Sequence, residues 1–224
     1  MYLKHPNKAL NQAFLKKPYQ GVPPEKAMYL FIGLDANFSP TIEQSKIFLS
    51  LLRYLEDGSL FWRAHGIHHP FLLPAYGQGD GWKYHATFSK IGFRPEHADP
   101  VSFAELLHVP TFGRSRLMVE DLSNEHLSRL NEAIVHGAAR HIFIPGTVAL
   151  HMQKSGAFKW MPKVPEEGQG LKIWKRIGGK TIYAHYHFSV YGKFEKEKRR
   201  QLQAIGALIS PAGAADSVLP PDGS

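Results

Sequence analysis

The sequence contains no cysteine among its 224 residues, which excludes disulfide bonds, cysteine nucleophiles and metal or iron–sulfur sites held by thiolates. It also lacks an apolar run of the roughly 18 residues that a membrane-spanning helix needs. The first 20 residues contain no apolar stretch of the kind found in secretory signal peptides. We therefore expect a protein of the cytoplasm that does not interact with membranes.

Acidic side chains are also scarce. Lys and Arg number 27 against 19 Asp and Glu, so the formal net charge is +8. The excess lies within residues 151–200, which hold 12 basic and 4 acidic residues interleaved with aromatic ones. This pattern suits a surface that binds a phosphate backbone. It equally suits a solvated helix face beside aromatic core residues, so the charge alone leaves both interpretations open.

Hydrophobic residues make up 43% of the chain, enough for a buried core and typical of one domain of ordinary size. Residues 1–27 are basic and contain prolines, and we expect them to form an arm before the domain. The domain itself is expected to span residues 28–208. Residues 209–224 have the composition of a disordered tail.

Several apolar runs that end in glycine or in polar residues predict buried strands. The predicted strands are 28–33, 141–146, 171–177 and 180–187. The last two flank Gly178 and Gly179, which is a hairpin signal. Because the other strands alternate with helical patterns, the sequence predicts an α/β domain with a mostly parallel sheet. In such sheets, the loops at the carboxyl ends of the strands form the functional site.

Helices are expected after the first strand, at 127–138, after the 141–146 strand and at 195–208. Ser39 as N-cap and Pro40 as the first helical residue are expected to begin the first of them. The pattern Ser-x-x-Glu at 102–105 is typical of a capping box and predicts a short helix there. Residues 57–81, rich in Gly, His and Pro, are interpreted as a long functional loop.

Three polar side chains follow predicted strands and are candidates for chemistry. Asp35 comes directly after the first strand, and His185 and His187 share one face at the end of another. A carboxylate and an imidazole at two strand ends of one sheet can converge on one pocket. The alternative is that Asp35 caps a turn and that the histidines are polar residues with ordinary structural partners.

The order of five short motifs resembles that of the uracil-DNA glycosylase superfamily. The motifs are G-L-D-A-N at 33–37, P-A-Y-G at 74–77, L-L-H-V at 106–109, I-F-I-P-G-T-V-A at 142–149 and H-Y-H-F-S-V-Y at 185–191. The first motif has Ala36-Asn37 where the best-known branch has proline and tyrosine. The resemblance implies a three-layer α/β/α domain with a central, mostly parallel four-stranded sheet flanked by helices. The lack of cysteine excludes the branches with an iron–sulfur cluster.

The resemblance also implies catalytic roles. Asp35 would orient the attacking water and stabilise the cationic sugar, while His185 or His187 would donate a hydrogen bond to uracil O2. Backbone N–H groups around Leu34 would add to this. His108 stands where an asparagine usually faces the base, and one imidazole donor and one acceptor suit uracil O4 and N3. Tyr76 is the candidate for stacking on the flipped base, although strict alignment puts Ala75 there.

DNA contacts are implied for four residues. Phe188 aligns with the residue that fills the gap left by the flipped base. Ser39, Ser189 and Lys193 are expected to contact the DNA, with phosphates held by Ser189, Lys193 and the basic run beyond. The expected partner is uracil-containing DNA, single- or double-stranded, with free uracil as product, no cofactor, and a monomeric, nucleoid-associated protein.

A histidine cluster, His65, His68 and His69, admits two interpretations. At helical spacing these side chains could bind zinc, but Gly66 and Pro70 favour a loop that lines the pocket or contacts the base. Three other functions therefore stay open beside uracil excision. They are excision of another deaminated base such as hypoxanthine, binding of abasic or uracil-containing DNA with little or no catalysis, and histidine-dependent metallohydrolysis.

Overall fold

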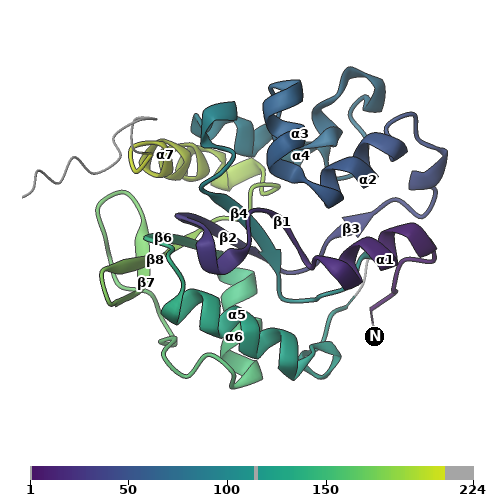
Figure 1. The fold of residues 1–224 in the computed structure, drawn as a ribbon. Helices are drawn as coiled ribbons and strands as arrows, with labels where there is room; N and C mark the ends of the chain where they lie inside the picture. Colours follow the sequence, from purple (N-terminus) through teal and green to yellow (C-terminus); the bar gives the residue numbers. More distant parts are fainter. Residues whose placement is uncertain (1, 114–115, 210–224) are drawn as a thin grey trace, which may run out of the picture.

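The protein folds around a six-stranded sheet, seen in a computed structural model that describes residues 2–113 and 116–209 (Figure 1). The strand order is β1-β4-β2-β6-β8-β7. The strands are β1 (Tyr19–Gly21), β2 (Tyr29–Gly33), β4 (Val101–Glu105), β6 (His141–Pro145), β7 (Lys172–Ile177) and β8 (Lys180–His185). The expected tail lies outside the described residues from 210 onward.

Four adjacent strands, β4, β2, β6 and β8, are parallel, whereas β1 and β7 are antiparallel edge strands. The mostly parallel sheet is confirmed. The count of four strands is wrong, because β1 pairs with β4 and the β7–β8 hairpin adds a strand at the opposite edge. A second, two-stranded sheet joins β3 (Asn37–Phe38) in parallel to β5 (Thr111–Phe112).

Helices cover both faces of the sheet. They are α1 (Lys8–Lys16), α2 (Phe48–Glu56), α3 (Gly58–His65), α4 (Trp82–Phe88), α5 (Asn124–His136), α6 (Gly146–Ser155) and α7 (Glu195–Gly206). In Figure 1, α2, α3, α4 and α7 lie above the sheet, and α5 and α6 lie below it. Within the described ranges, no helix combines the length and the apolar character that crossing a membrane requires.

The strand β2 shows how alternation builds two cores. Leu30 and Ile32 face the core that includes Leu127 of α5, whereas Tyr29 and Phe31 face the core that includes Leu202 of α7. All four β2 side chains are at most 2% exposed. A continuous apolar run of this kind is expected for a strand buried on both faces.

Aromatic side chains connect the four parallel strands on the α7 side of the sheet. Phe31 stacks on Phe103 of β4 at 5.4 Å between ring centroids and on Phe143 of β6 at 4.6 Å. Phe143 in turn stacks on Tyr183 of β8 at 5.4 Å. These four residues are register partners in the sheet, so the aromatic ladder (Phe103, Phe31, Phe143 and Tyr183) aligns the strands.

Residues 2–27 are part of the domain, so the separate arm that we expected over residues 1–27 is not what these residues form. Leu10 and Phe14 of α1 are 0% and 1% exposed and pack in a third core with Leu51 of α2. The α1 N-cap is Asn7, whose side chain accepts from Leu10 N–H at 3.0 Å. The basic composition of this segment obscured its apolar face.

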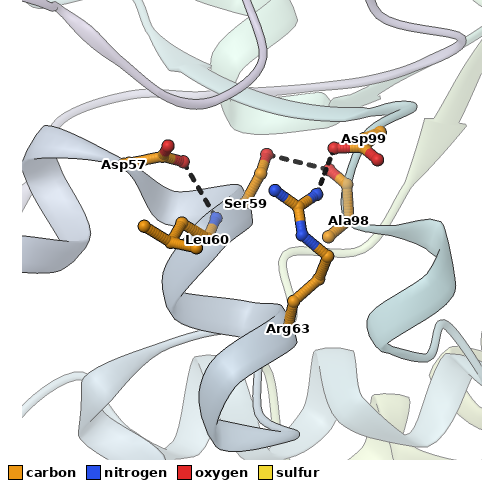
Figure 2. Close-up of polar contacts among 6 residues, drawn as sticks. All are labelled: Asp57, Ser59, Leu60, Arg63, Ala98 and Asp99. Carbon is orange, nitrogen blue, oxygen red and sulfur yellow. Dashed lines mark hydrogen bonds and ion pairs between the residues drawn. The ribbon is translucent and has the colours of Figure 1, made fainter.

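Residues 57–81 contain helix α3 and two 3-10 turns, η3 (Pro70–Leu72) and η4 (Pro74–Tyr76), so the prediction of one long loop is wrong. Figure 2 shows how α3 begins: the Asp57 carboxylate accepts from Leu60 N–H at 2.9 Å. Ser59 donates to the carbonyl of Ala98 at 3.1 Å, and an Arg63–Asp99 ion pair lies beside it. These contacts tie α3 to the segment before β4.

Two predicted helix starts are also wrong. Residues 102–105 belong to strand β4, because Phe103 and Ala104 are buried and the segment pairs with both β1 and β2. Ser39 and Pro40 precede a 3-10 turn, η2 (Ile42–Gln44), and the regular helix α2 begins only at Phe48. The hairpin at Gly178-Gly179 is confirmed. The helix expected at 127–138 forms over Asn124–His136, and β8 ends at His185, two residues before the expected end.

Substituting Leu10 tests whether α1 belongs to the fold. We expect Leu10→Ala to lower the free energy of unfolding by about 2–5 kcal/mol, because it removes buried methyl groups and leaves a cavity. Leu15→Ala is the matched control, since Leu15 lies on the same helix but is 83% exposed. Chemical denaturation should show that the control lowers the free energy of unfolding by less than about 0.5 kcal/mol. Equal small effects of both substitutions would contradict the packing of α1.

Candidate functional site

A cavity of about 270 Å³ opens at the carboxyl end of the parallel sheet. The loops after β2 and β8 and the last residue of β4 form its polar walls. The residues that line it are Gln20, Gly33, Leu34, Asp35, Ala36, Asn37, Phe38, Tyr54, Leu55, His69, Phe71, Asp80, Gly81, Tyr84, His85, Phe103, Glu105, His187 and Ser189. Asp35, Leu34, His187 and Ser189, which were predicted from the sequence, are therefore brought together.

Asp35 is held by a chain of hydrogen bonds from the second sheet. The Thr111 hydroxyl donates to Asp35 Oδ2 at 2.5 Å, and the Asn37 side-chain amide donates to the same hydroxyl oxygen at 3.1 Å. The Thr111 N–H donates to the carbonyl of Ala36 at 2.9 Å. This network orients the carboxylate at the strand exit, and Asn37, which departs from the superfamily pattern, is a member of it.

Of His185 and His187, only His187 is among the residues that line the cavity. Ser189 N–H donates to His187 Nδ1 at 3.3 Å, so the proton of the neutral ring lies on Nε2. Burial lowers the pKa of His187, although the negative charge of Asp35 opposes that effect. The arrangement favours a neutral imidazole with an N–H donor at Nε2.

His185 lies beneath the site and not in it. Its side chain is buried and contacts the ring of Phe188 at 4.8 Å, and its Nδ1 lies 2.8 Å from the carbonyl of Tyr186. Burial lowers the pKa of His185 to about 3. Of the two histidines left open by the sequence, the geometry therefore selects His187.

The buried lysine Lys198 holds the loop that carries His187. Its ammonium group donates to the carbonyl of Val190 at 2.6 Å and pairs with Glu195 at 2.9 Å. The side chain is almost fully buried, so these contacts replace its hydration. A lysine of the basic segment thus has a structural partner and is not available to a phosphate.

Glu105 is a site residue that the sequence analysis missed. It ends β4 opposite Gly33, and a Cβ atom at Gly33 would lie only 1.9 Å from Glu105 Oε2. Burial raises the pKa of the Glu105 carboxyl group to about 8, and the charge of Asp35 adds to the rise. Interpreting 102–105 as a helix start hid this residue; as a strand end, it would have been a candidate by the same rule as Asp35.

Phe71, and not Tyr76, provides the aromatic wall of the cavity. Tyr76 stacks on Phe71 at 4.4 Å with an angle of 9° between the rings, and its hydroxyl donates to the carbonyl of Asp80 at 2.5 Å. Tyr76 lines a separate, more open groove with Ser39 and Gly79. The prediction that Tyr76 stacks on a bound base is not supported by this placement, because the ring is already behind Phe71.

The three histidines of the 65–69 cluster lie in different environments. His69 lines the cavity and stacks on His85 of α4 at 3.6 Å, while His68 contacts His85 Nδ1 at 3.1 Å. Burial lowers the pKa of all three side chains, and His68 titrates near 3. His65 is exposed at the end of α3. In the described part of the chain, no group of three or more His, Asp or Glu side chains is arranged to hold a metal ion.

His108 does not line the cavity. Its ring lies 5.6 Å from that of His126, and burial lowers its pKa. The Nε2 of His126 in turn lies 2.8 Å from the backbone carbonyl of Glu105. Of this segment, Glu105 lines the cavity, three residues before His108, at the end of β4.

Phe188 is 1% exposed and packs against Tyr84 and His185, so this structure does not present it as a wedge. The exposed aromatic of the same loop is Tyr191, which is 73% exposed. The Lys83 ammonium group lies 4.4 Å from the centroid of its ring. Exposed Lys193 follows two residues later, in η8 (Gly192–Phe194).

The other basic residues of the 151–200 segment do not gather at the cavity. They belong to α6 and the segment after it, to β7 and β8, and to α7 (Figure 1). Lys172 and Arg200 pair with Glu167 and Glu197. Of the described basic residues, Lys83 adjoins Tyr84, which lines the cavity, and Lys193 lies in the loop that carries Ser189.

The raised pKa of Glu105 predicts that the free energy of unfolding falls as pH rises. Because its pKa is about 8 in the folded protein and near 4.5 otherwise, the folded state holds an extra proton between these values. The free energy of unfolding contributed by this group then falls as pH rises, by at most about 1.4 kcal/mol per pH unit. We expect Glu105→Gln to remove that fall, measured by denaturation between pH 6.5 and 8.5. Identical slopes in both proteins would contradict the raised pKa.

Comparison with known proteins finds no protein-family model that matches the sequence and no curated protein with significant similarity to it. The chemistry of the cavity is therefore the basis for assigning a function.

Proposed function

We propose that this protein hydrolyses the N-glycosidic bond of a deaminated base in DNA, with uracil as the first candidate. The observation that carries the proposal is the meeting of Asp35 and His187, from the ends of β2 and β8, at one cavity. A carboxylate and a neutral N–H donor match the two charges that develop when this bond breaks. The sugar becomes cationic and the departing base becomes anionic.

Asp35 supplies the group for the sugar. Thr111 orients its carboxylate. The carboxylate can accept a hydrogen bond from the attacking water and so position it, and its charge stabilises the positive charge on the sugar. Water adds to the anomeric carbon as the bond to the base breaks, and the base leaves with the bonding electron pair. The proton of the water passes to the carboxylate or to solvent, so the step needs no redox partner.

His187 supplies the donor for the base. A neutral imidazole with its proton on Nε2 can donate to a carbonyl oxygen that gains negative charge, as O2 of uracil does. The backbone N–H of Ser189 fixes this tautomer. Charge stabilisation of this kind is strongest when the donor is positioned before the reaction, and Lys198 holds the loop for that purpose.

The loop beyond His187 suits contact with DNA. Tyr191 is exposed, the ammonium group of Lys83 lies over its ring, and that of Lys193 lies over the ring of Phe194. An exposed ring can stack on a base, and cations of the same surface can contact phosphates. We therefore assign the DNA-stacking role to Tyr191 in place of Phe188. Ser189, which lines the cavity, stays a candidate for the phosphate beside the extruded nucleotide.

Asp35→Asn tests the catalytic assignment. The amide oxygen can still accept from Thr111, but the carboxylate charge and base are lost, so we expect base release to slow by about 100- to 10,000-fold. The assay is single-turnover release from oligonucleotides that carry uracil, hypoxanthine, xanthine or a thymine mismatch, followed by alkaline cleavage of the abasic site.

The control is Asp99→Asn, because Asp99 lies in the exposed ion pair with Arg63. Wild-type protein that releases none of these bases would exclude the glycosylase proposal. If such a protein still bound uracil-containing or abasic DNA, and Asp35→Asn left binding unchanged, a binding protein without catalysis would be the better assignment.

Tyr191→Ala tests the DNA-contact assignment. Loss of one stacking ring should weaken binding to single-stranded DNA by about 10-fold, while Tyr191→Phe should retain it. Fluorescence anisotropy at fixed salt concentration measures both. Since Tyr191 is exposed, the folding stability of each variant should stay close to that of the wild type. Unchanged affinity in Tyr191→Ala would place the DNA on another surface.

A further inference from the structure

Glu105 occupies the third polar wall of the cavity, and the proposed hydrolysis gives it no role. The carboxyl ends of β4, β2 and β8 lie at one edge of the sheet, so Glu105 is placed beside Asp35 and across from His187. The tight approach of its carboxyl group to Gly33 shows why that position has no side chain. The carboxyl group therefore reaches over the end of β2 into the cavity.

The surroundings of this carboxyl group contain no cation. None of the described residues that line the cavity is Lys or Arg. The titratable groups around it come from every element of the wall: Asp35, Tyr54, His69, Asp80, Tyr84, His85 and His187. Burial, with nearby negative charge, raises the pKa values of Tyr54 and Tyr84, and burial lowers the pKa values of the three histidines, although Asp35 opposes this at His187. These side chains are therefore neutral at pH 7.

We propose that Glu105, with its carboxyl group protonated, binds the hydrogen-bonding edge of the extruded base. This inference rests on the proposed function and names the group that reads the substrate. A neutral carboxyl group has one O–H donor and a carbonyl acceptor side by side. It can donate to a base carbonyl and accept from the adjacent ring N–H, a pair that uracil presents at O4 and N3 and hypoxanthine at O6 and N1.

The charge state of Glu105 follows from its position. Burial, with the charge of Asp35 as second cause, raises its pKa to about 8, so the group is mostly protonated at pH 7. Two neighbouring carboxyl groups in one pocket cannot both ionise easily. Asp35 has the Thr111 hydroxyl as a donor, which stabilises the charge there, and the proton is accordingly held by Glu105.

Ionisation of Glu105 would reverse its effect. A carboxylate has acceptors only, so it would face the base carbonyl without a donor and would oppose the negative charge on the departing base. Binding and release should therefore both decline as pH rises through about 8. The hydroxyls of Tyr54 and Tyr84 titrate well above this range, because burial and Glu105 raise their pKa values.

The experiment compares wild type, Glu105→Gln and Glu105→Ala between pH 6.5 and 9.5. Glutamine keeps a donor and an acceptor but has no proton to lose, whereas alanine has neither. Base release is measured on a single-stranded oligonucleotide with one deoxyuridine. Binding is measured by anisotropy on the same oligonucleotide with a non-cleavable 2′-fluoro-deoxyuridine, against a thymidine control.

At pH 7 we expect Glu105→Gln to stay within about threefold of wild type and Glu105→Ala to lose about 10- to 100-fold in affinity and rate. At pH 9.5, one ionisation near pH 8 should lower the affinity and the rate of base release of the wild type by about 30-fold relative to pH 7. We expect most of this decrease to be absent in Glu105→Gln. Ionisation of the base itself affects all variants equally. Glu132→Gln, on an exposed position of α5, is the control and should behave as wild type.

Two results would overturn the role of Glu105. One is a Glu105→Gln variant that is as impaired as Glu105→Ala while it still melts cooperatively, which would indicate proton transfer and not recognition. The other is a decrease in affinity and in the rate of base release above pH 8 that is the same in Glu105→Gln as in the wild type. If wild type binds the 2′-fluoro oligonucleotide with the expected pH dependence but releases no base, the glycosylase proposal fails and the role of Glu105 stands. Because thymine presents the same O4 and N3 pair, wild type that does not prefer the uracil analogue over thymidine overturns the choice of uracil, whereas equal affinity of wild type and Glu105→Ala overturns the role of Glu105.

Discussion

The in-register pairing of four parallel strands is the constraint on which the site depends. The aromatic ladder of Phe103, Phe31, Phe143 and Tyr183 marks that register, because each ring faces its partner across the sheet. Once the register is set, the carboxyl ends of β4, β2 and β8 lie at one edge. Residues that are far apart in the chain then meet at one cavity because the strands that precede them pair in register, as Gly33 does with Glu105.

Electrostatics divides the work within that cavity. Two of its carboxyl groups, Asp35 and Glu105, share the cavity with the neutral imidazole of His187, and none of the described lining residues is Lys or Arg. The Thr111 hydroxyl supports charge on Asp35, while burial holds the proton on Glu105. The same pocket can thus present an anion to a cationic sugar and a neutral donor–acceptor pair to a base. The differing environments of two like groups, and not their chemical identity, set these roles.

The sequence reached part of this site because its signals are local. An apolar run followed by Gly33 and Asp35 indicates a strand exit, and the pattern before His187 does the same. The sequence pattern placed His185 and His187 on one strand face and so could not separate them, whereas β8 ends at His185, and packing buries that residue against Phe188. The sequence analysis missed Glu105 as a site residue because the pattern at 102–105 is typical of a helix start, whereas these residues pair as strand β4. Phe188 and Lys198 illustrate the same limit, since an aromatic or a basic residue can be a core element as well as a contact for DNA.

The sequence by itself determined the α/β class, the mostly parallel sheet, the β7–β8 hairpin and the positions of Asp35 and His187 at strand ends. These follow from periodicity and turn chemistry, which act over a few residues. Only the tertiary structure decided that α1 and β1 complete the domain, that Phe71 and not Tyr76 lines the cavity, and that Glu105 replaces His108 at its wall. Burial and proximity between distant segments decide such matters, because they depend on which side chains the folded sheet brings together. The basic residues that the structure describes are spread over several elements, with Lys83 next to the cavity-lining Tyr84 and Lys193 in the loop after Ser189.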